Sequence, residues 1–379
     1  MAITVYSKRF KSELDKDQLE RLYLKNISDD LVGFRSFIHE DVECPMCNVS
    51  GAHYVSEGYS RLTSKKVKQA HFAFRNPDNT DAHRFFCDHY TGPDRVRDSA
   101  GEAFIKFGKD GSEVTRLVRE LVCRGIEHKV FDQTDIRNMR KWFAGLRESG
   151  NTVINYSPHV INLLRASFYS TGDTDKYEIQ NGMQHESWFN INDEVYKSLK
   201  YKYPPFFDIN LQTKENNPLM RLYSNALANK AHRLIVKDKG IKIFDRRELD
   251  DKYVAAMQLS KAITQHYDSL KRKFTTTLSI TKNNQILAFS ALLLFVSDWR
   301  EEVAREKFNM LAIIGNSIFP DAGNVIGMNP FIHYDAWRII HRIQDLIDLL
   351  PDFSNLDEEF QTEKQRLSEL YELNKDVSY

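Results

Sequence analysis

Three of the four cysteines in this 379-residue chain lie in one short stretch near its N-terminus, together with several histidines. Cys44 and Cys47 belong to a Cys-Pro-Met-Cys turn, in which two thiolates can reach one metal ion. His83 and Cys87 form a second pair, and their spacing would put both side chains on one face of a helical turn. Because structural zinc sites use four thiolate or imidazole ligands, the pattern Cys-x2-Cys-x35-His-x3-Cys predicts one zinc ion.

The identity of the histidine ligand stays open on the sequence. His71 competes with His83 for the fourth position, and His53 and His89 are weaker candidates. Four protein ligands leave no coordination position for water, so we expect the zinc to stabilise the fold rather than to take part in a reaction. A redox-active Cys-x-x-Cys is the alternative, but no βαβ pattern surrounds the motif. Cys123 lies on the apolar face of an expected helix and is interpreted as a core residue.

The residues between the two ligand pairs have strand-like content at 54–59 and 67–74, which predicts a β-hairpin. Basic residues gather between positions 58 and 77, with no acidic residue among them, and they are Arg61, Lys65, Lys66, Lys68 and Arg75. Basic side chains neutralise phosphates, and interleaved aromatic rings can stack on unpaired bases. We therefore expect this hairpin to bind nucleic acid, with a solvated strand face as the alternative.

The segment 42–90 resembles the N-terminal zinc module of the CoiA-like competence proteins. The resemblance rests on Val42-Glu43-Cys44-Pro45-Met46-Cys47, where the family has Phe-x-Cys-Pro-x-Cys, and on His71-Phe72-Ala73-Phe74, where the family usually has a second histidine in place of Phe74. It covers about 50 of the 379 residues. The resemblance implies association with DNA, a restriction-type nuclease fold after the ribbon, and a bacterial or phage setting in DNA uptake, phage defence or mobile-element biology.

A metal-dependent nuclease would need carboxylates that bind Mg²⁺ and a Lys or Gln that places the attacking water. Two stretches offer such residues, namely Glu113 with Glu127 and Lys129, and Asp173 and Asp175 with Glu178 and Gln180. With 53 acidic residues in the chain, such spacings also arise by chance, so no catalytic residue is assigned. Motifs of serine hydrolases, P-loop NTPases and dinucleotide-binding proteins are absent from the sequence.

The pattern of expected helices and strands predicts an α+β fold in three regions. We expect a zinc-binding module at 1–100, a mixed α/β region at 101–250 and a helical domain at 251–379. Helical spacing of apolar residues is found near 14–24, 113–125, 135–147, 158–168, 250–270, 284–307, 334–350 and 356–374. Strand-like content is found at 32–38, 126–131, 177–180, 205–211, 233–236 and 239–244.

Composition narrows the class of protein further. Hydrophobic residues make up 41% of the chain, and Lys+Arg and Asp+Glu both number 53, so nucleic acid would have to bind a local basic patch. The longest apolar run, 286–296, is shorter than the about 20 residues that a bilayer requires, and the N-terminus has no signal-peptide core. We therefore expect a cytoplasmic protein without a membrane partner. The last helices, 334–350 and 356–374, suit an alternative, non-enzymatic role as a surface for a protein partner.

Overall fold

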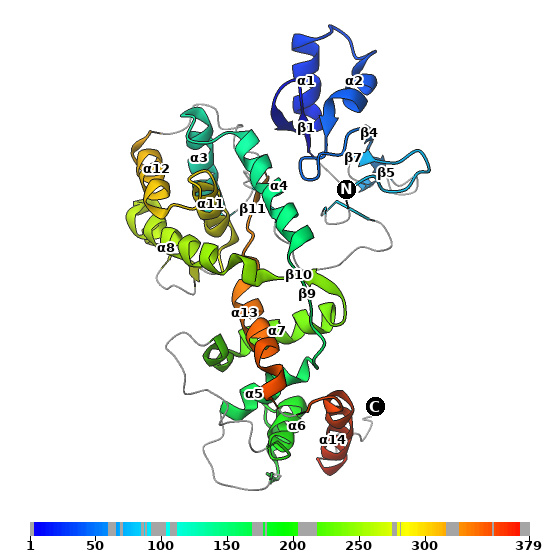
Figure 1. Ribbon diagram of the computed structural model, residues 1–379, viewed down its shortest axis with the longest axis vertical. Helices are drawn as coiled ribbons and strands as arrows, with labels where there is room; N and C mark the ends of the chain where they lie inside the picture. Colours follow the sequence, from blue (N-terminus) through cyan, green and yellow to red (C-terminus); the bar gives the residue numbers. More distant parts are fainter. Residues whose placement is uncertain are drawn as a thin grey trace. The chain divides into compact units, whose positions relative to one another are not determined.

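Two separate stretches of sequence combine to form each of the two units of the computed structural model (Figure 1). Unit 1 contains Met1–Asn151 and Glu248–Ile332, and unit 2 contains Thr152–Arg247 and His333–Tyr379. These units do not follow the three consecutive regions expected from the sequence, because 248–332 clusters with the N-terminal part and 333–379 with the middle. The structure describes residues 4–59, 66–68, 71–84, 87, 89–91, 104–106, 112–168, 177–178, 180–203, 218–274, 279–280, 282–315, 326–350 and 352–371.

The fold is α+β, as the sequence predicts, with many helices and short antiparallel strands. The N-terminal part of unit 1 begins with a small sheet in the order β2 (Ser12–Leu14), β1 (Val5–Ser7) and β3 (Val42–Glu43). Its helices are α1 (Lys16–Asn26) and α2 (Phe34–Asp41). The strand expected at 32–38 is wrong: Phe34 and Ile38 lie one helical turn apart on α2, and both are buried against the sheet and α1 in one core.

The hairpin expected between the two ligand pairs is confirmed as a pair of two-stranded ladders. β4 (Ala52–Val55) pairs with β7 (His71–Phe74), and β5 (Gly58–Tyr59) pairs with β6 (Lys66–Lys68), both antiparallel. Phe72 and Phe74 of β7 are buried in the same core as the cysteines of the two pairs. The hairpin is therefore packed onto the N-terminal part at its β4–β7 end.

The rest of unit 1 is a helical assembly with one small ladder. Its elements are α3 (Glu113–Glu127), α4 (Gln133–Ser149), α8 (Asp250–His266), α9 (Asp268–Lys271), α11 (Asn284–Phe295), α12 (Glu301–Ile313), and strands β8 (Phe104–Lys106) and β11 (Ile326–Met328). The apolar helix α11 packs against α3, α8 and α12 and is buried along most of its length. In the described part of the chain, none of the helices is both long enough and apolar enough to cross a membrane.

Helix α3 continues through the segment that the sequence assigns to a strand. The expected strand at 126–131 is wrong, because α3 extends to Glu127 and the chain then turns at Lys129, which has a positive φ of 55°. Gly125 lies inside the helix, and a Cβ there would come within 2.2 Å of the Phe131 ring. The glycine thus leaves the space that lets Phe131 fold back onto the helix it has just left.

One helix expected at 284–307 is two helices in the structure. The chain turns between α11 and α12, where Asp298 and Trp299 adopt positive φ values of 50° and 60°. The Trp299 ring lies against Trp142 of α4, with ring centroids 5.3 Å apart. The turn therefore directs the Trp299 side chain onto a neighbouring helix. Local apolar spacing does not predict this break between the two helices.

Unit 2 is also mainly helical. Its elements are β9 (Asn151–Val153, starting at the unit boundary), α5 (His159–Phe168), η2 (Met183–His185), α6 (Ile191–Lys200), η4 (Pro218–Tyr223), α7 (Asn225–Asp238), β10 (Lys242–Phe244), α13 (Tyr334–Leu346), η6 (Ile347–Leu349) and α14 (Leu356–Leu370). The strand expected at 233–236 is wrong, because these residues lie within α7. Of the other expected strands, 239–244 contains β10, the described residues of 177–180 are irregular, and 205–211 lies outside the described residues. The last helix, α14, packs on α6 and buries Leu356, Phe360 and Leu367.

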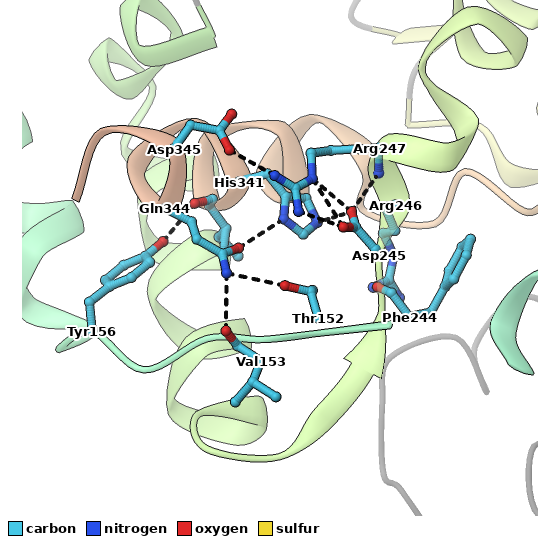
Figure 2. Close-up of polar contacts among 11 residues, drawn as sticks. Thr152, Val153, Tyr156, Phe244, Asp245, Arg246, Arg247, His341, Gln344 and Asp345 are labelled. Carbon is cyan, nitrogen blue, oxygen red and sulfur yellow. Dashed lines mark hydrogen bonds and ion pairs between the residues drawn. The ribbon is translucent and has the colours of Figure 1, made fainter. Parts of the chain in front are cut away.

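Polar side chains tie α13 to the small β9–β10 ladder (Figure 2). Gln344 donates hydrogen bonds to the Val153 carbonyl (3.0 Å) and to the Thr152 hydroxyl (3.1 Å). Arg247 donates to Asp345 at 2.7 Å and also contacts Asp245. These bonds join segments about 100 to 190 residues apart in sequence, so they fix the path of the second stretch of unit 2.

Candidate metal centre

The first ligand pair is held in a tight turn that directly follows β3. The Cys44 N–H donates to the Val49 carbonyl at 2.8 Å, and the Asn48 N–H donates to the Cys44 carbonyl at 3.1 Å. Asn48 takes a left-handed φ of 61°, which asparagine tolerates better than most residues. The Met46 N–H points at the Cys44 sulfur, 3.4 Å away. The turn therefore orients backbone donors and both sulfurs toward one side.

The second pair follows the end of β7, where Asp81 organises the chain. One carboxylate oxygen of Asp81 accepts the His83 N–H at 2.9 Å, and the other accepts the Thr91 N–H and hydroxyl at 2.7 and 2.6 Å. The Cys87 N–H donates to the Arg84 carbonyl at 2.9 Å, which turns the chain back toward the first pair. Asp81 thus fixes the backbone on both sides of the His83–Cys87 pair.

The two pairs converge on one point. The nearest donor atoms of Cys44, Cys47, His83 and Cys87 all lie within 4.8 Å of one another, and all four residues are buried. The sulfurs of Cys44 and Cys87 are 3.8 Å apart, and the His83 Nδ1 atom is 3.4 Å from the Cys47 sulfur and 3.6 Å from the Cys87 sulfur. A sulfur separation of 3.8 Å is far longer than the about 2.05 Å of a disulfide bond, and none of the four cysteines forms a disulfide.

These separations can be tested against tetrahedral metal coordination. With bonds of about 2.3 Å to sulfur and about 2.0 Å to nitrogen, a tetrahedron puts two sulfurs about 3.8 Å apart and a sulfur and a nitrogen about 3.5 Å apart. In the structure, the Cys44 and Cys87 sulfurs are 3.8 Å apart, and His83 Nδ1 lies 3.4 Å from the Cys47 sulfur and 3.6 Å from the Cys87 sulfur, while all donor atoms lie within 4.8 Å of one another. The four residues are therefore a buried Cys3His cluster that could hold a metal ion.

The histidine that lies among the three sulfurs is His83. His71 is buried in β7 opposite Val55 and does not belong to the donor set of the described residues. The His53 ring packs at a tilt against the His39 ring, with ring centroids 5.1 Å apart. His89 lies beside the His83 ring at 5.7 Å, and burial lowers the pKa of His89 to about 3, so its imidazole stays neutral.

Burial and mutual hydrogen bonding set the charge of the three thiols. Hydrogen bonds from the thiols of Cys44 and Cys87 lower the pKa of Cys47. Burial, followed by the hydrogen bond with Cys47, raises the pKa of Cys44, and hydrogen bonds with the other two thiols raise the pKa of Cys87. These directions favour a thiolate at Cys47 and protonated thiols at Cys44 and Cys87. A bound cation would supply the positive charge that stabilises all three cysteines as thiolates.

Two arginines of α4 form ion pairs with the N-terminal part of unit 1, and one of them contacts the residues on either side of the first ligand pair. Arg137 donates a 2.7 Å hydrogen bond to the Asn48 side chain, forms an ion pair with Glu43, and stacks over the Tyr6 ring at 3.8 Å. Arg140 forms an ion pair with Glu13 of β2 at 2.6 Å, with 1% and 5% of the two side chains exposed. Local sequence patterns do not reveal these residues, because they lie 94 and 127 positions from their acidic partners and share no local motif with them.

The basic residues expected to contact nucleic acid are described only in part. Lys66 and Lys68 lie in strand β6, whose backbone is described, whereas Arg61 and Lys65 lie outside the described residues. Arg75 follows β7, is exposed, and donates to the Asn79 carbonyl at 3.2 Å. The expected patch thus coincides with the hairpin that the Cys3His cluster anchors.

Among the described residues, those considered for a nuclease do not form a shared carboxylate site. Glu127 ends α3 and Lys129 lies in the turn after it, while Glu113 at the start of α3 pairs with Lys273. Glu178 and Gln180 lie in an exposed irregular segment of unit 2, and Asp173 and Asp175 fall outside the described residues. The Cys3His set is the one group of three or more metal-ligating side chains found in the described part of the chain.

Comparison of the chain with protein-family models, with curated proteins and with solved structures gives no match. The fold and the site by themselves define the class: an α+β protein whose N-terminal module contains a buried Cys3His cluster suited to a metal ion.

Proposed function

We propose that this protein is a zinc-containing nucleic-acid-binding protein, in which the metal stabilises the module that carries the basic hairpin. The observation that supports zinc is the agreement of the sulfur–sulfur and sulfur–nitrogen separations with a tetrahedron. Thiolate and imidazole donors in this geometry favour zinc over the hard cations, which prefer oxygen. Cys44, Cys47, His83 and Cys87 would hold the ion, and four protein ligands would leave no position for a reacting water.

The position of the ligands on the chain supports a role in shaping the hairpin. Cys47 precedes β4, and His83 follows β7, so one metal ion would join the two ends of the hairpin. Closing a loop of this length with a metal removes much of its conformational freedom. The basic run that includes Lys66, Lys68 and Arg75 would then be presented on a fixed ribbon, where it can neutralise phosphates.

The site favours nucleic-acid binding without catalysis. The described carboxylates do not converge on a Mg²⁺ site, and the Cys3His cluster is closed. The apolar face of α14 packs on α6 within unit 2, so this helix uses its buried residues inside the protein itself. A nuclease and a purely protein-binding scaffold are therefore less well supported.

The test is the salt dependence of binding to single-stranded and double-stranded DNA and RNA, measured without divalent metal. We expect Lys65→Gln/Lys66→Gln/Lys68→Gln to weaken binding and to reduce the slope of log K against log salt by about 0.7–0.9 for each lost phosphate contact. A matched control, Lys8→Gln/Lys11→Gln/Lys25→Gln, removes the same charge from exposed positions of the same unit. The proposal fails if no nucleic acid binds at low salt, or if the control variant weakens binding as much.

A further inference from the structure

Unit 2 contains a large cavity between α5, α6 and the segment that leads into α6. Its volume is about 720 Å³, and residues of all three elements line it, among them Asn162, Tyr177, Trp188 and Lys200. Sites for small organic molecules typically measure about 300–1,000 Å³. The cavity belongs to unit 2 alone and is separate from the Cys3His cluster of unit 1.

Most of the charged groups on the cavity wall are already paired with each other. Arg165 lies 3.7 Å from the Asp193 carboxylate. Glu194 accepts hydrogen bonds from Lys197 at 2.6 Å and from the Tyr177 hydroxyl at 2.7 Å. Two charged side chains of the lining, Glu178 and Lys200, take no part in these contacts. Glu178 is exposed to solvent.

Lys200 is the charged group on this wall that lacks an anionic partner. It is more than nine-tenths buried, and its ammonium lies over the Tyr201 ring at 4.6 Å. Within the part of the chain that the structure describes, no carboxylate lies within ion-pair distance of it. Because this ammonium has no counter-charge within the protein, the wall is complementary to an anion at this point.

The rest of the lining suits a planar polar ring. Tyrosine and tryptophan side chains contribute to the wall, and Trp188 is 63% exposed, which leaves its ring face open to a ligand. Amide side chains also line the cavity, and they are Asn162, Gln180, Asn190 and Asn225. Aromatic faces stack on nucleobases, and amide side chains match the donor and acceptor edge of adenine.

Two lining residues, Asn162 and Tyr196, belong to a polar network that continues behind the wall. The Tyr196 hydroxyl lies 2.7 Å from His159 Nδ1 and accepts from the Asn162 amide at 3.2 Å. His232 Nδ1 lies 3.0 Å from the Pro158 carbonyl and 3.2 Å from the same amide. The buried Asn162 carbonyl oxygen has no hydrogen-bond partner among the described residues, and a donor on a ligand would satisfy it.

We propose that this cavity binds a nucleoside monophosphate, with the phosphate on Lys200 and the base against the aromatic side chains. The volume, the Lys200 ammonium without an anionic partner, and the aromatic and amide lining each support one part of that ligand. The proposal is independent of zinc and of nucleic-acid binding by the hairpin.

The experiment is isothermal titration calorimetry of the full chain with AMP, GMP, CMP and UMP, each in turn, and with adenosine and inorganic phosphate as half-ligands. We expect at least one nucleotide to bind with a dissociation constant below about 1 mM, and both half-ligands to bind more weakly. Lys200→Met should weaken nucleotide binding by about tenfold to a hundredfold, because a charge-assisted contact is lost. Trp188→Ala, at a position where the side chain is largely exposed, should weaken it as well.

Lys202→Met is the matched control, since this lysine lies outside the cavity and pairs with Glu359 at 2.6 Å. We expect its nucleotide affinity to equal that of the unchanged protein. The absence of binding by all four nucleotides would overturn the proposal. So would unchanged affinity in both Lys200→Met and Trp188→Ala, or adenosine binding as tightly as AMP.

Discussion

The guanidinium of Arg137 donates a 2.7 Å hydrogen bond to the side chain of Asn48, the residue that follows the Cys44–Cys47 turn. The same guanidinium pairs with Glu43, the residue that precedes the turn. One side chain of α4 therefore holds both ends of the turn that carries two of the four candidate ligands. This places part of the support for the metal centre on a helix that lies about 90 residues further along the chain.

Replacing Arg137 should weaken unit 1 and its metal centre together. We expect Arg137→Met to lower the free energy of unfolding by about 1.5–3 kcal/mol, the range for hydrogen bonds to charged groups, and to speed metal loss to a chelator. Guanidinium chloride unfolding and the rate of metal transfer to a chromogenic chelator measure the two effects. Arg116→Met, at an exposed position of α3, is the control and should change stability by less than about 0.5 kcal/mol. Equal behaviour of the two variants would contradict the role of Arg137.

Two helical glycines of unit 1 should respond to alanine in opposite directions. A Cβ at Gly125 would lie 2.2 Å from the Phe131 ring, so Gly125→Ala should destabilise the protein by about 1–3 kcal/mol through overpacking. A Cβ at Gly145, in α4, would meet no atom within 4 Å, so Gly145→Ala should stabilise by about 0.5–1 kcal/mol through helix propensity. Thermal unfolding of the two variants measures both. A stabilised Gly125→Ala would show that the Phe131 contact is wrong.

The buried His341 should make unit 2 sensitive to acid. It lies among Asp245, Arg247 and Gln344 (Figure 2), and burial lowers its pKa to about 4. The unfolded chain takes up a proton on this residue below about pH 6.5, whereas the folded chain holds the imidazole neutral down to pH of about 4. The unfolded state therefore binds more protons in this window, and stability falls as the pH is lowered through it, by up to about 3 kcal/mol.

The measurement is urea unfolding between pH 4 and pH 7.5, with His341→Gln as the variant that cannot titrate at this position. We expect the variant to lose part of the stability difference between pH 6.5 and pH 4, because its side chain takes up no proton in either state. His266, at the exposed end of α8, serves as the control in His266→Gln. An unchanged pH dependence in His341→Gln would exclude His341 as the source.

The sequence predicted the candidate ligands because thiolates at Cys-x-x-Cys spacing have few other uses in such a chain. It left His71 and His83 open, since both follow the first pair at loop distance and the choice depends on the end of β7. His71 faces Val55 across the ladder, whereas His83 lies beyond the strand, where the chain returns to Cys47. That return depends on Asp81, whose bonds to His83 and Thr91 have no signature in the sequence.

Helices with a sustained apolar face were predictable, and short apolar runs were not. The segments 32–38, 126–131 and 233–236 each fit a strand or a turn of helix equally well, and the structure assigns them to α2, the end of α3 with its turn, and α7. The discontinuous units could not be read from local spacing either. They depend on contacts such as that of Arg124 with the Leu311 carbonyl at 3.2 Å, across 187 positions.

Metal content tests the central claim most directly. The unchanged protein, Cys44→Ser/Cys47→Ser and the control Cys123→Ser, whose buried cysteine lies outside the cluster, would be purified without chelator and compared by elemental analysis. We predict one zinc per chain in the unchanged protein and in the control, and zinc lost together with stability in the double variant. Absence of zinc from the unchanged protein, or zinc retained by the double variant, would contradict a Cys3His zinc site.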